Sequence, residues 1–286
     1  MKRSSAFRRR GAPCLQGSGL LRADNVSFTY GQGPGIRPAT LSGISLEIRR
    51  GQVVGILGPN GSGKTTLLRM LCGMRRPDHG SVTLEGTSLD RLSRRALARR
   101  IAVVPQETQL AFEYTVLEMV LMGRHPHLGL FQLEGPNDFD VARDALAATG
   151  TAQLEHRRFS TLSGGEKQRV VIAAALAQAA DIMLLDEPTA SLDLGYQLEV
   201  AALVTSLNQE RSVTIVISTH DLNLAASTCH ELVMLRQGRV IAAGPTTEVL
   251  TPANVRELYD VDADVHVHEP SGHLVVVPVT RVTRPR

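Results

Sequence analysis

The chain contains the stretch Gly58-Pro59-Asn60-Gly61-Ser62-Gly63-Lys64-Thr65-Thr66, which fits the pattern G-x-x-x-x-G-K-[ST]. A short apolar segment, Val53–Leu57, precedes it as a predicted buried strand, and apolar residues at helical spacing follow it. The loop glycines allow successive backbone N–H groups to point into one anion-binding concavity, and the following helix adds its positive end. Lys64 is expected to reach the β- and γ-phosphates, and the Thr65 hydroxyl to hold Mg²⁺. The stretch therefore predicts a site for a nucleoside triphosphate.

Positive charge is concentrated at the start of the chain. The 286 residues are 43% apolar and 21% charged, as in an ordinary globular protein, and the formal net charge is +3. Residues 1–20 hold five of the 31 basic residues and no acidic residue, so residues 21–286 carry 26 basic and 28 acidic side chains, a net charge of −2. This near-neutral body has no general attraction to nucleic acid. We expect residues 1–20 to form a disordered basic tail, with a contact to anionic lipid as the alternative.

The cysteines and the apolar runs indicate the compartment. Cys14, Cys72 and Cys229 are scattered without a C-x-x-C pair, which fits a reducing cytosol rather than a disulfide framework or a zinc ribbon. No apolar run approaches the roughly 20 residues that a membrane-spanning helix needs. Residues 1–20 also lack the apolar segment of a secretory signal. We therefore expect a protein that does not cross a membrane by itself.

The region before the phosphate loop is predicted to be antiparallel β-structure, because Leu20–Tyr30 and Leu41–Ile48 alternate apolar and polar residues. Tyr30 stands just before a turn, where it could stack on an adenine ring or serve as an edge-strand aromatic. After the first helix we expect a short strand over residues 80–86 and a basic helix over residues 92–100. No aromatic residues are interleaved with its arginines, which favours a solvated helix face over a nucleic-acid patch.

Three further predicted strands end in polar residues. Residues 101–106 end at Gln106, residues 181–188 contain Asp186 and Glu187, and residues 213–221 contain His220. Ligands bind at the carboxyl ends of strands in open α/β sheets. We expect Asp186 to coordinate Mg²⁺, Glu187 to polarise an attacking water as general base, and His220 to lie near the γ-phosphate.

Between these strands, residues 107–180 lack strand signals and are predicted to form a helical insertion. His125 and His127 flank Pro126 and could bind a metal, but a loop without a carboxylate cluster is favoured. Ser163-Gly164-Gly165 opens an Ala-rich helix and is a second anion-binding element, with a cap hydroxyl, free N–H groups and a helix dipole. Because one nucleotide site needs only one such cradle, the second indicates that another molecule's nucleotide is held.

Taken in order, these motifs resemble the nucleotide-binding subunit of ABC transporters over residues 21–260. The resemblance implies an α/β fold: a P-loop NTPase core with a RecA-like mixed sheet, an antiparallel β subdomain and an inserted α-helical subdomain at about residues 107–180. Residues 261–286 would then be a C-terminal β extension. The matched motifs are Walker A (residues 58–66), the Q-loop glutamine (Gln106), the signature (162–166), Walker B with the catalytic glutamate (182–187), the D-loop Ser191-Leu192-Asp193 and the switch histidine (His220).

The resemblance implies ATP and Mg²⁺ as ligands. Glu187, His220 and Gln106 would act in hydrolysis, while Thr65, Gln106 and Asp186 would hold Mg²⁺. The two copies of a head-to-tail dimer would each close Ser163 and Gly165 over the ATP bound by Lys64 of the other. The nucleotide-binding residues implied are Tyr30, Gly58, Pro59, Asn60, Gly61, Ser62, Gly63, Lys64, Thr65, Thr66, Ser163, Gly164, Gly165 and Asp193.

The partners that the resemblance implies are transmembrane permease subunits and, indirectly, a periplasmic or extracellular substrate-binding protein, with no nucleic acid. The protein would lie peripherally on the cytoplasmic face of the inner membrane. Glu166 departs from the commonest family signature, which has Gln, and leaves the Ser163-Gly164-Gly165 cradle intact.

A finer resemblance concerns Thr115–His127, Thr219–Asn223 and the tail Asp262–Pro278, which look like segments of importers of ferric siderophores, haem and cobalamin. The tail adds His266, His268 and His273 around a predicted hairpin turn at residues 269–272. These histidines could bind haem or iron, although a solvated terminal hairpin is favoured.

The motifs leave other functions open. An ABC ATPase that serves another cargo carries the same motifs, as does an ABC ATPase that acts on nucleic acid or ribosomes. A P-loop metabolic kinase has no use for the Ser163-Gly164-Gly165 element. Cargo selectivity would belong to the permease and the binding protein, so the residues of this chain separate neither the three cargoes nor the direction of transport.

Overall fold

A computed structural model describes residues 19–31, 40–108, 112–190 and 192–282. The predictions for the basic tail, for Cys14 and for Ser191 of the D-loop motif fall outside these residues, apart from residues 19 and 20 of the tail. Of the C-terminal extension, residues 283–286 also lie outside them.

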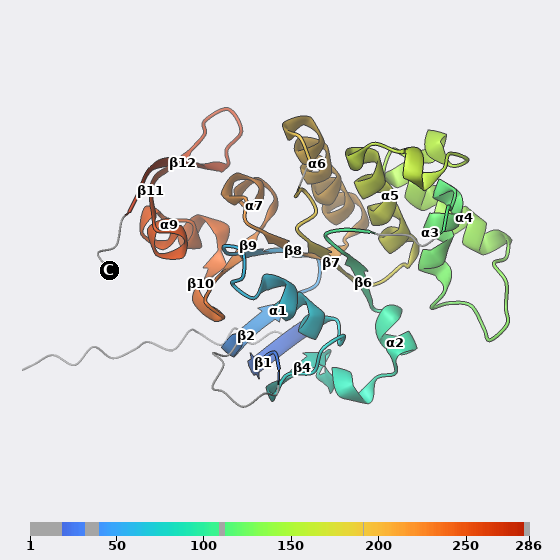
Figure 1. Ribbon diagram of the computed structural model, residues 1–286, viewed down its shortest axis with the longest axis horizontal. Coiled ribbons are helices and arrows are strands. Elements are labelled where there is room, and N and C mark those ends of the chain that lie inside the picture. The colour runs from blue at the N-terminus through green and yellow to red at the C-terminus, as the bar shows by residue number, and fades with distance from the viewer. Residues whose placement is uncertain (1–18, 32–39, 109–111, 191, 283–286) are drawn as a thin grey trace, which may run out of the picture.

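The centre of the molecule is a six-stranded mixed sheet in the order β10-β9-β3-β8-β7-β6 (Figure 1). Five neighbouring strands run parallel, and β10 alone pairs antiparallel, with β9. Parallel strands of one sheet end at the same edge, so the loops after them converge. The strands are β3 (Val53–Leu57), β6 (Ile101–Val104), β7 (Ile182–Asp186), β8 (Thr214–Thr219), β9 (Glu231–Arg236) and β10 (Arg239–Pro245).

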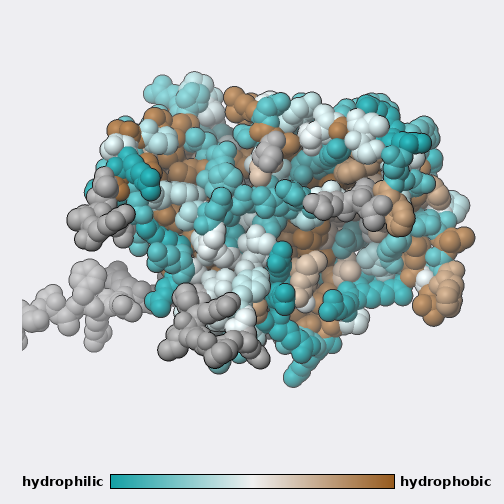
Figure 2. Space-filling model, viewed as in Figure 1, coloured by the Kyte–Doolittle hydropathy of each residue, from teal (hydrophilic) through white to brown (hydrophobic). Residues whose placement is uncertain are grey.

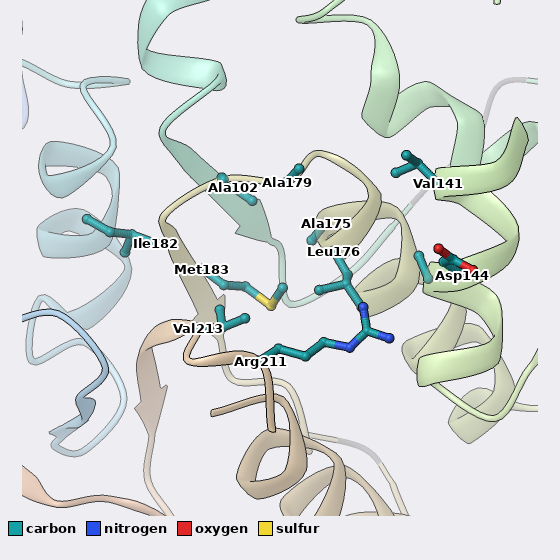
Figure 3. Close-up of a pocket in the computed structure, with 12 residues that line it drawn as sticks. Ala102, Val141, Asp144, Ala175, Leu176, Ala179, Ile182, Met183, Arg211 and Val213 are labelled. Atoms are coloured by element: carbon teal, nitrogen blue, oxygen red, sulfur yellow. The ribbon is translucent and has the colours of Figure 1, made fainter. Parts of the chain in front are cut away.

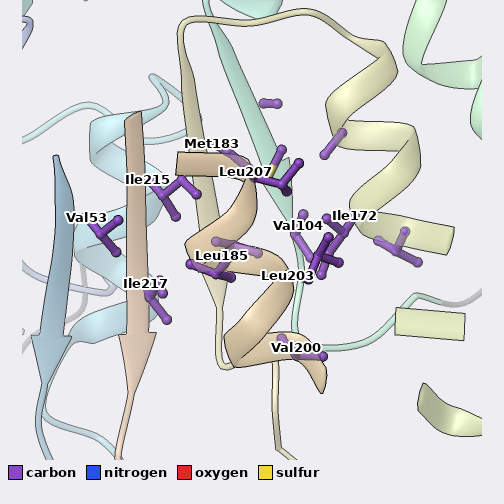
Figure 4. Packing of buried hydrophobic residues seen from close by; sticks show 14 of the residues in the cluster. Val53, Val104, Ile172, Met183, Leu185, Val200, Leu203, Leu207, Ile215 and Ile217 are labelled. Carbon is purple, nitrogen blue, oxygen red and sulfur yellow. The ribbon is translucent and has the colours of Figure 1, made fainter. Parts of the chain in front are cut away.

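The apolar runs of these strands are explained by packing on both faces of the sheet. Successive side chains of a strand point to opposite faces. Val53 and Leu57 of β3 therefore join one core, while Val54 and Ile56 join the other. Figure 4 shows the first core, where residues of α5 (Gly164–Ala177) and α6 (Leu194–Arg211) pack on the sheet. A strand buried on both faces has no need for polar alternation.

The second core lies between the six-stranded sheet and an antiparallel sheet in the order β2-β1-β4-β5. Helix α1 (Lys64–Leu71) runs between the two sheets (Figure 1). This arrangement confirms the predicted antiparallel β-structure before the phosphate loop. The strands are β1 (Leu21–Phe28), β2 (Leu41–Ile48), β4 (His79–Leu84) and β5 (Thr87–Ser88).

The helical block contains α3 (Val116–Leu121), α4 (Pro136–Ala148) and α5, at one end of the sheet (Figure 1). Helix α4 begins five residues before the apolar pattern that starts at Val141. Its first turn is polar and is set by Pro136 at the helix start and by Asp138, whose carboxylate accepts from Gly135 N at 3.0 Å. Apolar spacing alone could not locate that start.

The basic helix α2 (Arg94–Ala98) is shorter than predicted, with Ser93 as its N-cap. Arg94, Arg95 and Arg99 are exposed, which confirms the predicted solvated face, and two of them also make contacts. Arg95 Nε and Arg99 Nε both donate to Pro126 O, at 2.9 and 2.8 Å. His127 Nε2 lies 2.8 Å from Gln178 O in the same region. The loop around Pro126 is therefore held against α2, a contact between segments about thirty residues apart that helix periodicity does not reveal.

The C-terminal part of the chain folds beside α7 (Leu222–Thr228). It forms α9 (Pro252–Tyr259) and a two-stranded antiparallel hairpin of β11 (Val261–Val267) and β12 (Leu274–Arg281) (Figure 1). The predicted terminal hairpin is thus confirmed. In the described residues no helix is both long and apolar enough to span a membrane. The remaining helices are α8 (Thr246–Val249) and the 3₁₀ turns η1 (Leu89–Arg91), η2 (Met122–Arg124), η3 (Ala152–Leu154) and η4 (Phe159–Thr161).

Candidate nucleotide-binding site

The phosphate loop connects β3 to α1 at the carboxyl edge of the sheet. Gly61 and Gly63 have φ values of 79° and 107°, a backbone region that favours glycine. Gly58 is required for another reason, because a Cβ there would lie 2.2 Å from Leu235 O. The loop therefore takes a shape that side chains at these positions would prevent, and it leads directly into the N-terminus of α1.

Lys64 is buried, with 4% of its side chain exposed, and its ammonium group has three oxygen partners. Nζ donates to Gly58 O at 2.8 Å and to Pro59 O at 3.3 Å, and it pairs with Glu187 Oε1 at 3.1 Å. A buried ammonium is tolerated only when its donors are satisfied. The same three donors could instead meet phosphate oxygens.

Asp186 is buried at the end of β7 and accepts two hydroxyl groups on one oxygen. Thr65 Oγ1 donates to Asp186 Oδ1 at 3.2 Å, and Ser218 Oγ donates to the same atom at 2.5 Å. Hydroxyl and carboxylate oxygens suit Mg²⁺, a hard cation that keeps several waters and needs few protein ligands. The donor set of Thr65 and Asp186 therefore fits the ion.

Glu187 follows β7 with a φ of 47°, which is uncommon for a residue with a side chain. Its N–H donates to Ser218 O at 3.0 Å, which fixes the turn. Its carboxylate lies between two partners, Lys64 Nζ on Oε1 at 3.1 Å and His220 Nδ1 on Oε2 at 3.1 Å. Strained backbone of this kind costs on the order of 1–3 kcal/mol and clusters at functional sites.

Two adjoining cavities lie at this edge of the sheet. One, of about 480 Å³, is lined by Tyr30, Thr40, Asn60, Gly61, Gly63, Lys64, Thr65, Thr66, Gln106 and Glu187. The other, of about 270 Å³, is lined by Asn60, Gln106, Glu187, Thr189, Ala190, Gln197, His220 and Asp221. Gln106 is exposed and borders both cavities. The structure thus brings together residues from four strand ends as the sequence predicted.

Tyr30 lines the first cavity, and its hydroxyl is 3.3 Å from Thr66 Oγ1. The ring meets Phe28 edge to face at 4.9 Å between centroids and lies under the Arg75 guanidinium, 5.9 Å from the ring centroid. The hydrogen bond to Thr66 lowers the pKa of Tyr30, and Arg69 and Arg75 act in the same direction. Both a contact with a bound base and a structural packing role fit the position of Tyr30, because the ring borders the cavity and also packs on Phe28 at the end of β1.

Ser163, Gly164 and Gly165 are absent from the described residues that line these two cavities. Ser163 is the N-cap of α5 and forms a capping box with Glu166: Glu166 N donates to Ser163 Oγ at 3.3 Å, and Ser163 N donates to Glu166 Oε2 at 2.8 Å. The Ser163 amide lowers the pKa of Glu166. Asp193 caps α6, accepting from Tyr196 N at 3.1 Å.

Sequence reasoning missed Ser218, which contacts both Asp186 and Glu187. A serine inside the apolar run of residues 213–219 was the available signal, since a buried hydroxyl needs a partner. In the described part of the chain no group of three or more His, Cys, Asp or Glu could hold a metal ion. His268 Nδ1 lies 3.0 Å from Ser271 Oγ within its own hairpin turn.

A further cavity of about 390 Å³ lies between the central sheet and the helical block (Figure 3). Its walls are mostly alanine and aliphatic side chains from α4, α5, β6 and β7, with Asp144 and Arg211 as charged members. Nothing in this lining resembles the glycine loop, so the phosphate chemistry belongs to the cavities at the carboxyl edge.

Known proteins resemble the chain over most of its length. The family described as ABC transporter matches residues 41–190. The cobalamin import ATP-binding protein BtuD of Halobacterium salinarum is 44% identical over 84% of this chain, which spans only 60% of that relative. The hemin import ATP-binding protein HmuV of Gloeobacter violaceus is 42% identical, covering 86% of this chain and 92% of its own length. The ferric enterobactin transport ATP-binding protein FepC of Escherichia coli is 36% identical, covering 91% and 94%.

Two solved structures of ABC transporter proteins are also similar to this chain. An inward-facing conformation of a metal-chelate type ABC transporter has a TM-score of 0.80 at 30% identity, over 92% of this chain and 98% of its own. An ATP-binding cassette solved as a dimer in a post-hydrolysis state with ADP and Pi has a TM-score of 0.70 at 30% identity, over 79% and 98%. These comparisons confirm the predicted fold class and the resemblance to the siderophore, haem and cobalamin importer subgroup.

Proposed function

The chain belongs to the ABC transporter family, and on that basis we propose that it is the ATP-hydrolysing subunit that powers import of a metal chelate through a membrane permease. The cargo class is a ferric siderophore, haem or cobalamin, because the relatives serve these three. The observation that carries the chemistry is the position of Glu187, 3.1 Å from both Lys64 and His220.

ATP binding begins at the phosphate loop, since an ABC ATPase domain binds ATP. The N–H groups of the loop and of the N-terminus of α1 donate to the phosphate oxygens, and Tyr30 stacks on the adenine. Phosphate oxygens replace Glu187 Oε1 as a partner of Lys64, which frees that carboxylate oxygen to accept a proton. Thr65, Asp186 and Gln106 hold Mg²⁺, which supplies positive charge against the developing charge on the β- and γ-phosphates.

Hydrolysis uses Glu187 as the general base. A water molecule in the second cavity attacks the γ-phosphorus and gives its proton to Glu187, while the bond to the oxygen between the β- and γ-phosphates breaks. The products are ADP and inorganic phosphate. His220, bonded to Glu187 Oε2, orients the carboxylate, and it lines the same second cavity as Glu187.

ABC cassettes dimerise, and the proposed dimer is a head-to-tail pair of this chain. Ser163 and Gly164 are exposed at the N-terminus of α5 and lie outside the chain's own phosphate cavities. A helix N-terminus with free N–H groups suits an anion. In the dimer each copy applies these residues and Gly165 to the γ-phosphate held by the other copy, so a single chain has an incomplete site.

ABC cassettes of import systems also pair with permease subunits. Large apolar side chains are exposed on the helical block, with Phe112 at 73%, Leu130 at 85% and Phe131 at 96%. Figure 2 shows brown surface over this end of the molecule. We assign this surface to the permease. We also propose that the protein lies on the cytoplasmic face of the inner membrane and that a substrate-binding protein acts across that membrane. The same proposal divides the chain into a basic tail (residues 1–20), an ATPase domain (21–260) with a helical insertion at about 107–180, and a C-terminal extension (261–286).

The test is capture of the permease by tagged Glu187→Gln protein from detergent-solubilised native membranes with ATP and Mg²⁺. Glu187→Gln is expected to bind ATP without turning it over, so the assembled complex persists. Lys64→Ala, which is expected to bind ATP on the order of 100-fold more weakly, is the matched control. A many-span permease recovered with the first variant, and less with the second, supports the proposal. Recovery of nucleic acid or ribosomal proteins in place of a membrane protein contradicts it. Adding haem, a ferric siderophore or cobalamin to the captured complex then identifies the cargo.

A further inference from the structure

The C-terminal extension, defined here as α9, β11 and β12, lies beside the segment that carries His220. β12 packs against α7, which begins two residues after His220, and α9 packs against β11 (Figure 1). Two parts of the sequence, residues 219–223 and the tail, are therefore joined in space. Neither is used by the chemistry described above except through His220.

Tyr259, the last residue of α9, makes the first connection. Its hydroxyl donates to His220 O at 3.0 Å. Burial raises the pKa of Tyr259 far above its ordinary value, and the nearby carboxylates of Asp221 and Glu187 raise it further. The phenol therefore remains protonated and able to donate over the whole physiological range.

Asn223, in the first turn of α7, makes the second connection. Its side-chain amide pairs with both backbone groups of Val276 in β12: Val276 N donates to Oδ1 at 2.8 Å, and Nδ2 donates to Val276 O at 3.2 Å. Val276 is buried, so the amide is anchored to the hydrophobic core. Asp221 caps the same turn, accepting from Asn223 N at 2.9 Å and Leu224 N at 3.0 Å.

His220 itself has little packing to hold it. Its side chain is 53% exposed, and the hydrogen bond that the ring makes is to Glu187. A half-exposed side chain keeps rotamer freedom unless its backbone and its partners fix it. The backbone on one side of His220 is fixed by strand β8, and on the other side by Tyr259 and by the Asn223 connection.

We propose that Tyr259 and Asn223 are positioning residues that hold His220 against Glu187, so that the C-terminal extension sets the rate of ATP hydrolysis. The proposal rests on the role of His220 given above. Neither residue lines the cavity where Lys64 lies, although Tyr259 lines a separate cavity of about 210 Å³ beside residues 59–62 of the phosphate loop. We expect both to act on turnover, and KM for ATP tests this directly.

The test compares Tyr259→Phe and Asn223→Ala with the wild-type chain. Each is expected to lower kcat for ATP by about 3- to 10-fold, the size expected for loss of neutral hydrogen bonds, with KM for ATP unchanged. Tyr114→Phe, which removes a hydroxyl from the helical block, is the matched control and keeps wild-type kcat. Tyr259→Phe removes one oxygen atom from a ring that stays in place, so its fold is expected to survive.

The decisive arm repeats both substitutions in a His220→Ala chain, with phosphate release followed in single turnovers. Because the two residues act through His220, they are expected to have no further effect there. An equal loss of rate in the His220→Ala chain, a raised KM, or wild-type kcat in both single variants overturns the proposal. If His220→Ala alone keeps the wild-type rate, the role of His220 fails first, and that outcome is distinguishable from the others.

Discussion

Two elements of this chain place serine, glycine and free N–H groups at the start of a helix, and they differ in how complete they are. The phosphate loop before α1 surrounds the buried Lys64, whose ammonium already has three oxygen partners. The signature element, Ser163-Gly164-Gly165 before α5, has its serine and first glycine exposed. Its cap is satisfied by its own Glu166, and it lies outside the cavities that Lys64 lines.

The difference teaches that a phosphate site can be divided between two surfaces. The phosphate loop supplies charge, a glycine cradle and neighbouring carboxylates in one place, as expected for a site that one chain completes for binding. The signature element offers a helix N-terminus whose serine and first glycine are exposed, which suits a phosphate presented by another copy. Under the proposed function, the comparison separates ATP binding, which we expect one chain to perform, from hydrolysis, for which we expect two chains to be needed.

The largest expected effect comes from the phosphate loop. Lys64→Ala removes a buried cation whose charge-assisted hydrogen bonds would hold the phosphates, so ATP affinity is expected to fall on the order of 100-fold. Isothermal titration calorimetry with the single chain measures the change. Lys167→Ala, at a lysine of α5 away from this loop, is the control and is expected to keep the wild-type Kd. An equal loss of ATP affinity in both variants would contradict the claim that the phosphate loop, and not the helix of the signature element, binds ATP in the single chain.

The signature element is expected to respond in the opposite way. A Cβ on Gly165 would lie 2.1 Å from Tyr196 Cδ1, so Gly165→Ala must displace the start of α5 or the ring. We expect Kd for ATP to stay within about twofold while turnover falls about 10- to 100-fold, as when a preorganised donor is lost. A Cβ on Gly164 would meet Leu192 Cδ2 at an ordinary 3.5 Å. Gly164→Ala is therefore the matched variant and should keep wild-type thermal stability. Comparing the two variants shows whether crowding against Tyr196 causes the loss of turnover in Gly165→Ala.

The smallest expected effect concerns Glu166. Its pKa is lowered by the Ser163 amide, so its ionised form stabilises the folded chain. That contribution is fully present above the unfolded-state pKa of about 4.3 and is lost as the pH falls through the lower folded-state value. At pH 7, Glu166→Gln should lower the midpoint of thermal unfolding by only about 2 °C, since Gln keeps an acceptor for the Ser163 amide. The difference should vanish under acid conditions. A difference that grows below pH 4 would contradict this role.

The sequence predicted the parts of the site that depend on local pattern. The apolar run of β7 followed by Asp186 and Glu187 located a strand end, and the glycine loop located the phosphates. Contacts between residues that are distant in the sequence could not be predicted from local pattern. Lys64 meets Glu187 only because β3, β8 and β7 are neighbours in that order. The pairing of Asn223 with Val276 depends on how the hairpin packs on α7, which periodicity cannot specify.

Other contacts were missed for a similar physical reason. The arginines of α2 are exposed, as their spacing predicted, yet Arg95 Nε and Arg99 Nε also donate to the carbonyl of Pro126. Long side chains extend well beyond their own helix or strand. Predicting which face of a helix is exposed therefore does not show what the charged ends of its side chains contact. The polar first turn of α4 likewise carries no apolar signal, only the Pro136 and Asp138 caps.

The most direct test of the divided site is the mass of the Glu187→Gln chain in sedimentation velocity, with and without ATP and Mg²⁺. The account predicts one chain without nucleotide and two chains with ATP, because hydrolysis no longer separates them. It also predicts that Glu187→Gln combined with Ser163→Arg binds ATP and stays a single chain. A Glu187→Gln chain that remains single when saturated with ATP, or a double variant that dimerises equally well, would contradict the claim that Ser163 completes the site of a second copy.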